Sequence, residues 1–145
     1  MTEHNRKFLI FSIQGSLFAL DLSQVAEVGD PPQMWPIPLA PACYRGVMSF
    51  HGDIVAVMDL AIFLGMSGRS LCEKIIILRQ DIASLAFLID TVVRIIPEED
   101  VSASFGPASE SVFATAKLSL IDGEAILLDL DLLVQKAEIG MHKKQ

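Results

Sequence analysis

The stretch 46–65, GVMSFHGDIVAVMDLAIFLG, contains the signals that decide the fold. Two apolar runs, 46–50 and 54–58, are separated by the pair Gly52-Asp53, which predicts a turn. Two β-rich runs around a glycine-containing turn predict a hairpin. Both runs are apolar almost throughout instead of alternating with polar residues. This pattern indicates strands that are covered on both faces, as in a barrel or a sandwich.

Similar hairpins are predicted on both sides of this stretch. Asp122-Gly123 is the pair most typical of a two-residue type I′ hairpin turn. Ser23 either caps one helical turn or lies in an extended segment. The prolines in residues 29–41 exclude a regular element there and predict an ordered connector. The predicted elements are hairpins at 8–22, 74–90 and 112–129, a helical turn at 60–64 ended by Gly65, a loop at 98–111, and a C-terminal helix at 129–138.

The order of these elements repeats once along the chain. Hairpin 8–22 matches hairpin 74–90, because each ends in an aspartate followed by a valine-containing extension. Hairpin 46–59 matches hairpin 112–129, and each of these has a turn glycine and a closing aspartate. The repeat holds for the pattern and not for residue identity. It predicts an all-β fold of two similar small β-barrels packed together, with short helices.

The composition excludes several classes of protein. Hydrophobic residues make up 52% of the 145 residues, which provides a sizeable core and excludes disorder for most of the chain. The formal net charge of -7 argues against binding to nucleic acid or to an anionic membrane surface. No apolar run approaches the roughly 20 residues of a transmembrane helix. Residues 1–7 are polar and lack the apolar core of a signal peptide. We therefore expect a cytoplasmic protein without membrane insertion.

The residue types that carry chemistry are scattered. His51 and Asp53 flank the predicted turn, but no nucleophile lies within sequence reach of them, so no catalytic residues are predicted. The chain has 3 histidines, none in a pair with metal-ligand spacing, and no metal or cofactor is expected. Cys43 and Cys72 are expected to be idle or buried thiols, because a reducing compartment disfavours a disulfide.

Binding through the surface of a barrel is the remaining possibility. Leu9, Leu22 and Val25 lie near predicted strand edges and beside the connector. An apolar patch at such a place is typical of a site for a protein partner. From the pattern alone, these residues are either members of that patch or plain core residues.

The stretch 46–65 also resembles the signature of CheW-like domains, the adaptors of bacterial chemosensory arrays. The usual pattern has a Gly-Val start, Asn-Leu-Arg-Gly at the turn, and an apolar run that ends in Asp-Leu. Here Gly46-Val47, Gly52 and Asp59-Leu60 fall in register. Ser49-Phe50-His51 replaces Asn-Leu-Arg, and Ala56 replaces a usual proline. The segments FLIFSIQGSLFALDLSQVAEV and FLIDTVVRII extend the resemblance over nearly the whole chain, from residue 8 to about residue 134.

The resemblance implies two five-stranded, SH3-like β-barrels within a single domain that spans residues 1–145. It implies that the chain termini cross between the two barrels. The terminal residues 1–7 and 140–145 are expected to be flexible.

The resemblance also implies a non-catalytic scaffold. Such adaptors couple the cytoplasmic tips of methyl-accepting chemoreceptors to the regulatory domain of the histidine kinase CheA in this two-component system. By position, Val25, Gly46 and His51 match the receptor-binding groove. Leu9, Leu22 and again Val25 match the kinase-binding surface.

Three other functions are kept as alternatives. The first is an adaptor of a non-flagellar, chemosensory-like pathway such as twitching motility. The second is a small β-barrel module that binds nucleic acid, which the acidic balance opposes. The third is a hydrolase that uses His51 and Asp53.

Overall fold

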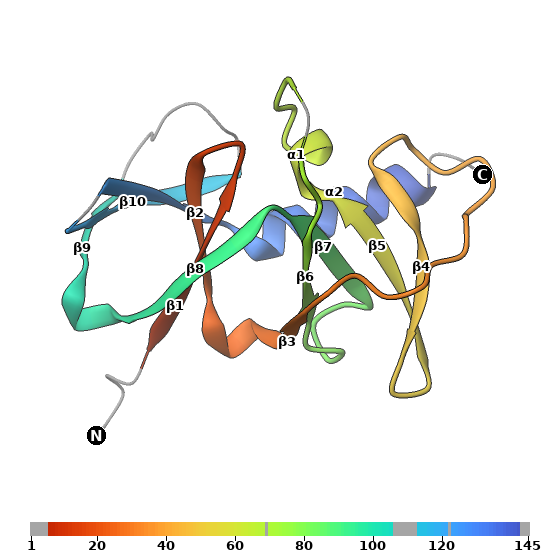
Figure 1. The fold of residues 1–145 in the computed structure, drawn as a ribbon, viewed down its shortest axis with the longest axis horizontal. Coiled ribbons are helices and arrows are strands. Elements are labelled where there is room, and N and C mark those ends of the chain that lie inside the picture. The colour runs from red at the N-terminus through yellow and green to blue at the C-terminus, as the bar shows by residue number, and fades with distance from the viewer. Residues whose placement is uncertain (1–5, 69, 106–112, 122, 143–145) are drawn as a thin grey trace.

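A computed structural model describes residues 6–68, 70–105, 113–121 and 123–142, and this part of the chain is mostly β (Figure 1). The strands are β1 (Lys7–Ile13), β2 (Ser16–Asp21), β3 (Val25–Gly29), β4 (Tyr44–Phe50), β5 (Asp53–Asp59), β6 (Lys74–Leu78), β7 (Leu85–Ile89), β8 (Thr91–Pro97), β9 (Ser102–Phe105), β10 (Ala114–Leu120) and β11 (Gly123–Leu128). The α-helices are α1 (Leu60–Phe63) and α2 (Leu130–His142), and the 3₁₀ turns are η1 (Leu22–Gln24) and η2 (Glu98–Asp100).

The strands form two sheets that lie side by side in Figure 1. Sheet A has six strands in the order β8-β1-β2-β11-β10-β9, and sheet B has five in the order β3-β6-β7-β5-β4. Each sheet joins two antiparallel hairpins through one parallel pair, β2 with β11 in sheet A and β7 with β5 in sheet B. Helix α2 runs from the junction of the sheets toward the sheet B side.

The chain crosses between the two sheets twice. β3 directly follows β2 of sheet A in the chain, but it pairs with β6 of sheet B. β8 directly follows β7 of sheet B, but it pairs with β1 of sheet A. Each sheet therefore combines strands from both halves of the chain, so the halves cannot separate without breaking the backbone hydrogen bonds of both sheets. This arrangement makes the two halves of the chain one cooperative unit.

The sequence repeat is visible in the backbone at matching places. The register of β4 against β5 shifts at Arg45, and the register of β10 against β11 shifts at Thr115. The aspartate that ends each hairpin then caps a helix. Asp59 Oδ1 accepts from the backbone N–H of Ile62 at 3.3 Å, and Asp129 Oδ1 accepts from the backbone N–H of Leu132 at 3.1 Å. These caps stabilise the first turns of α1 and α2.

Three apolar clusters cover both faces of the central strands, as the unbroken apolar runs predict. One cluster lies within sheet A and includes Phe8 and Ile10. One lies within sheet B and includes Val55 and Val57. The largest lies between the sheets and under both helices. It is formed by alternate residues of the same strands and by helix residues, among them Leu9, Phe11, Met58, Phe87, Leu130, Leu133 and Ala137.

The prediction of two closed five-stranded barrels is not confirmed. In the described part of the chain, the hydrogen-bonded order of each sheet is open, with edges at β8 and β9 in sheet A and at β3 and β4 in sheet B. Sheet A has a sixth strand because β9 pairs with β10. β9 lies in a segment predicted as a loop, since its SASF sequence is too short and too poor in β-branched residues to indicate a strand.

The hairpin turns lie where the sequence predicts them, but the residues that form each turn differ from the predicted pair. Phe50 pairs with Asp53, so His51 and Gly52 form the turn, with φ of 50° and 88°. Positive φ at both central residues indicates a type I′ turn, in which glycine takes the second position. The predicted pair Gly52-Asp53 is therefore one residue too late. Gly123 pairs with Leu120 and begins β11 instead of lying in the turn; Asp122 is outside the described residues.

The predicted terminal flexibility concerns mainly residues 1–5 and 143–145, which are outside the described residues. Within the described part, Lys7 begins β1 and α2 extends to His142. Among the helices described, none is long and apolar enough to cross a membrane.

Candidate functional site

His51 stands at the tip of the β4–β5 hairpin, exposed to solvent. Its ring packs on the neighbouring Phe50 ring, with centroids 4.2 Å apart and planes inclined by 58°. The register of the two strands fixes the backbone of the turn. The imidazole is therefore held beside Phe50 on an exposed turn, where a partner can reach it.

Gly46 lies buried in β4, where the connector crosses the strand. Trp35 N donates to Val47 O at 2.9 Å, and Val47 N donates to Trp35 O at 2.7 Å. A Cβ atom at Gly46 would lie 2.5 Å from Trp35 O, and the φ of Gly46 is +150°. Any side chain here meets both a backbone clash and a conformation that only glycine adopts easily. Gly46 thus acts through the backbone and lets the connector cover the edge of sheet B.

The three leucine and valine candidates have different environments. Leu9 is only 1% exposed and packs in the cluster between the sheets, so its side chain is a core residue that a partner does not reach. Leu22 in η1 and Val25 at the start of β3 are half-buried and pack against the same cluster. These two therefore present part of their surface where the chain crosses from sheet A to sheet B.

The structure does not gather the candidate receptor residues into one compact set. Val25 is on β3 and His51 is at the end of β4, and these strands are the opposite edges of sheet B with β6, β7 and β5 between them. Gly46 is buried beneath the connector. A common groove for the three residues, like the grouping of Leu9, Leu22 and Val25, stays a prediction.

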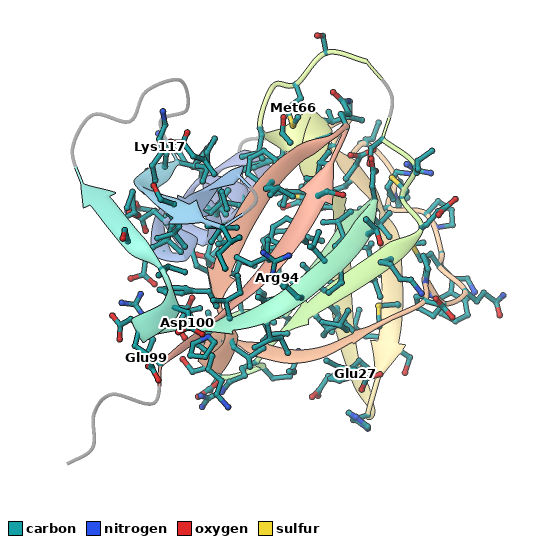
Figure 2. All side chains as sticks on the ribbon, turned by 60° about the vertical axis from the view of Figure 1, so that its left-hand side comes forward. Glu27, Met66, Arg94, Glu99, Asp100 and Lys117 are labelled. Atoms are coloured by element: carbon teal, nitrogen blue, oxygen red, sulfur yellow. The ribbon has the colours of Figure 1, made fainter. Side chains whose placement is uncertain are left out.

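Exposed apolar side chains on β8 are candidates that the sequence reading missed. Ile95 is 50% exposed and Val93 is 38% exposed, on a strand that forms an edge of sheet A. Figure 2 shows β8 crossing this face of the molecule, with Arg94 between them in sequence. The run TVVRII follows a buried strand directly and reads as more core. What distinguishes this run from a core strand is that the chain leaves sheet B after β7 and β8 becomes an edge strand of sheet A. The side chains on one face of β8 are then left without a covering layer.

A polar cluster lies under the segment that leads into β6. The buried carboxylate of Asp59 accepts from Arg45 Nη1 at 3.4 Å and from Cys72 Sγ at 3.5 Å. Burial raises the pKa of the Cys72 thiol, and it also raises the pKa of Cys43. Both cysteines are free and protonated at neutral pH, which makes them poor nucleophiles. Within the described residues, no group of three or more His, Cys, Asp or Glu side chains is arranged to hold a metal ion.

Asp90, the second buried carboxylate, ties three segments together. It accepts from Ser70 Oγ at 2.6 Å, from Leu71 N at 2.6 Å and from Gln14 N at 2.8 Å. Burial by itself would raise its pKa, but these hydrogen bonds favour the carboxylate, and the pKa of Asp90 is lowered. The role of Asp90 is to fasten the β1–β2 turn to the segment before β6.

A family model for the CheW-like domain matches residues 7–138, from the first strand to the C-terminal helix. This chain belongs to the CheW-like domain family. It is 26% identical to the chemotaxis protein CheW of Thermotoga maritima, over 90% of this chain and 89% of the relative. It is 24% identical to the chemotaxis protein CheW of Rhizobium meliloti, over 90% and 88%.

A solved structure shows the same fold. The scaffolding protein TtCheW from Thermoanaerobacter tengcongensis superposes with a TM-score of 0.77 and 26% identity, over 89% of this chain and 92% of that chain. The structural similarity therefore extends over most of this CheW-like chain.

Proposed function

We propose that this chain is a non-catalytic adaptor that couples chemoreceptors to a CheA-type histidine kinase in the cytoplasm. The match of the CheW-like family model to residues 7–138 carries this proposal. The whole-chain similarity to a protein named as a scaffold supports it. An adaptor needs two separate contact surfaces and no reaction centre, and the chain offers exposed apolar and polar groups on edge strands.

The proposed kinase surface consists of Leu22 and Val25, where the chain crosses between the sheets, with Leu9 supporting them from the core. An apolar side chain that is buried against a partner stabilises the complex through the apolar surface that it removes from water. We expect Leu22→Glu to weaken binding to the kinase regulatory domain by at least about tenfold, measured by calorimetry. Ile62→Glu on α1 is the control, because it makes the same change from an apolar to a charged side chain at a surface position outside the proposed contact, where Ile62 is 45% exposed. Equal losses for both variants would remove Leu22 from the surface.

The proposed receptor surface includes Val25 and His51, with Gly46 holding the backbone in place. Histidine at neutral pH is mostly uncharged, whereas the arginine usual in the family carries a permanent charge and five donors. We expect His51→Arg to change affinity for a receptor signalling fragment by about tenfold, the effect of one charge-assisted hydrogen bond. The turn keeps its conformation, so the melting temperature changes little. Unchanged affinity for every receptor tested would exclude His51 from the contact.

A further inference from the structure

A pocket of about 360 Å³ lies between α2 and the parallel pair of strands β5 and β7. Ala56 of β5, Leu85 of β7 and Val134 of α2 form apolar walls. The volume falls within the roughly 300–1,000 Å³ of sites that bind small organic molecules. None of the residues considered so far as contacts for a kinase or a receptor lines this pocket, so it is a separate feature of the surface.

The polar groups around the pocket favour positive charge. The Tyr44 hydroxyl donates to Ala137 O at 3.3 Å, which leaves its oxygen as an acceptor. The exposed carboxylate of Glu138 lies at the rim. Burial is the main cause that raises the pKa of Tyr44 to about 12, and the negative charge of Glu138 adds to it. A second negative charge is thus disfavoured at this place, and the described residues that line the pocket include no basic side chain.

We propose that this pocket binds an organic ammonium group carried on an apolar body, with Glu138 pairing with the ammonium and the apolar walls holding the body. The ring of Tyr44 adds an aromatic surface of the kind that attracts cations. The same chemistry occurs in a free amine and in a lysine side chain of a partner protein. The proposal does not depend on the adaptor function.

The test is a titration of the full chain with 2-phenylethylammonium, followed by ¹H–¹⁵N NMR. We expect chemical-shift changes confined to the elements that line the pocket, which are β4, β5, β7 with the two residues before it, and α2. Saturation is expected near about 10 mM, since so small a ligand has a millimolar Kd. The uncharged analogue 2-phenylethanol has the same body and is expected to bind at least about fivefold more weakly, because it cannot form the ion pair.

Glu138→Gln is expected to weaken binding of the ammonium about tenfold, because it removes the charge and keeps the shape of the side chain. The matched control is Glu99→Gln, which makes the same charge change in η2 at a residue that does not line the pocket (Glu99 is labelled in Figure 2). Equal binding by the Glu138→Gln variant and the wild type, equal binding of the alcohol and the ammonium, or shift changes outside these elements would overturn the proposal. Binding of N-acetyl-lysine methylamide would support a lysine side chain as the occupant, and binding of the free amine alone would support a small molecule.

Discussion

At the scale of single residues, two positions are constrained by the backbone that surrounds them. Gly46 is held by the close approach of Trp35 O and by a positive φ. We expect Gly46→Ala to lower the free energy of unfolding by at least about 2 kcal/mol, since a strained backbone residue costs about 1–3 kcal/mol before any clash is counted. Denaturant unfolding at constant m-value measures the loss.

The control for Gly46 is Gly29→Ala. A Cβ atom at Gly29 meets Glu27 Oε2 at 3.9 Å, an ordinary contact with a flexible side chain. This substitution should change the free energy of unfolding by less than about 1 kcal/mol. Equal stability of the two variants would show that the connector does not approach β4 as closely as the distance from Gly46 to Trp35 O indicates.

Asp90 is the second constrained residue, and its effect depends on pH. Its pKa is lowered in the folded state, so the folded chain prefers the carboxylate more strongly than the unfolded chain does. The resulting stabilisation is present above the pKa of an unfolded aspartate, about 3.9, and it is lost as the pH falls through the lower folded pKa. We expect Asp90→Asn to be destabilising at pH 7 and to lose less stability than the wild type between pH 5 and pH 3.

Thermal unfolding across that pH range measures this difference. Asp100→Asn is the control, because Asp100 is exposed in η2 and is not part of the Asp90 cluster. Parallel pH profiles for the wild type and the Asp90→Asn variant would show that the hydrogen bonds from Ser70, Leu71 and Gln14 do not favour the charged form.

At the scale of elements, the aspartates that cap α1 and α2 occupy matching places in the two repeats of the chain, and the cap of α2 can be tested by substitution. Asp129 accepts from Leu132 N and begins α2, whose buried face includes Leu130 and Leu133. We expect Asp129→Ala to destabilise the fold by about 1 kcal/mol, whereas Asp129→Asn, which can still cap the helix, should cost only a few tenths. Circular dichroism during urea unfolding distinguishes the two. Equal losses would show that the charge, and not the capping hydrogen bond, supports α2.

The hairpins and the C-terminal helix follow from local sequence, and the pairing of distant elements does not. Apolar runs, turn glycines and the spacing of Leu130, Leu133 and Ala137 predict these elements from short-range physics. The exact turn pair at His51-Gly52 differs by one residue, because a glycine fits either central position of a hairpin turn. β9 is missed because its pairing with β10, and not its composition, makes it a strand.

At the scale of the whole molecule, the two crossings of the chain between the sheets, before β3 and before β8, decide which residues are available to a partner. Pattern alone leaves Leu9, Leu22 and Val25 equivalent, because all three are apolar and near strand edges. Packing separates them: Leu9 is enclosed between the sheets, whereas Leu22 and Val25 are half-buried at the crossing. The exposure of Ile95 on β8 has the same origin, since it depends on which sheet the strand joins.

The passage of the chain between the two sheets also connects stability with function. An adaptor that transmits a signal between two partners works best as one rigid body, and Val25 lies where the chain passes from sheet A to sheet B. Each sheet combines strands from both halves of the chain. We expect a single unfolding transition for the whole chain, with calorimetric and van't Hoff enthalpies that agree. Two separate transitions in calorimetry would mean that the sheets are independent units.

The central claim is that this chain joins a receptor to a kinase, and co-sedimentation tests it most directly. A membrane-anchored receptor signalling fragment is mixed with the CheA-type kinase of the same genome, with and without the chain, and the kinase in the pellet is measured along with its autophosphorylation. The account predicts that the kinase sediments with the receptor only when the chain is present, and that the Leu22→Glu variant leaves the kinase in solution. Kinase that sediments equally well without the chain, or that stays in solution with it, would contradict the account.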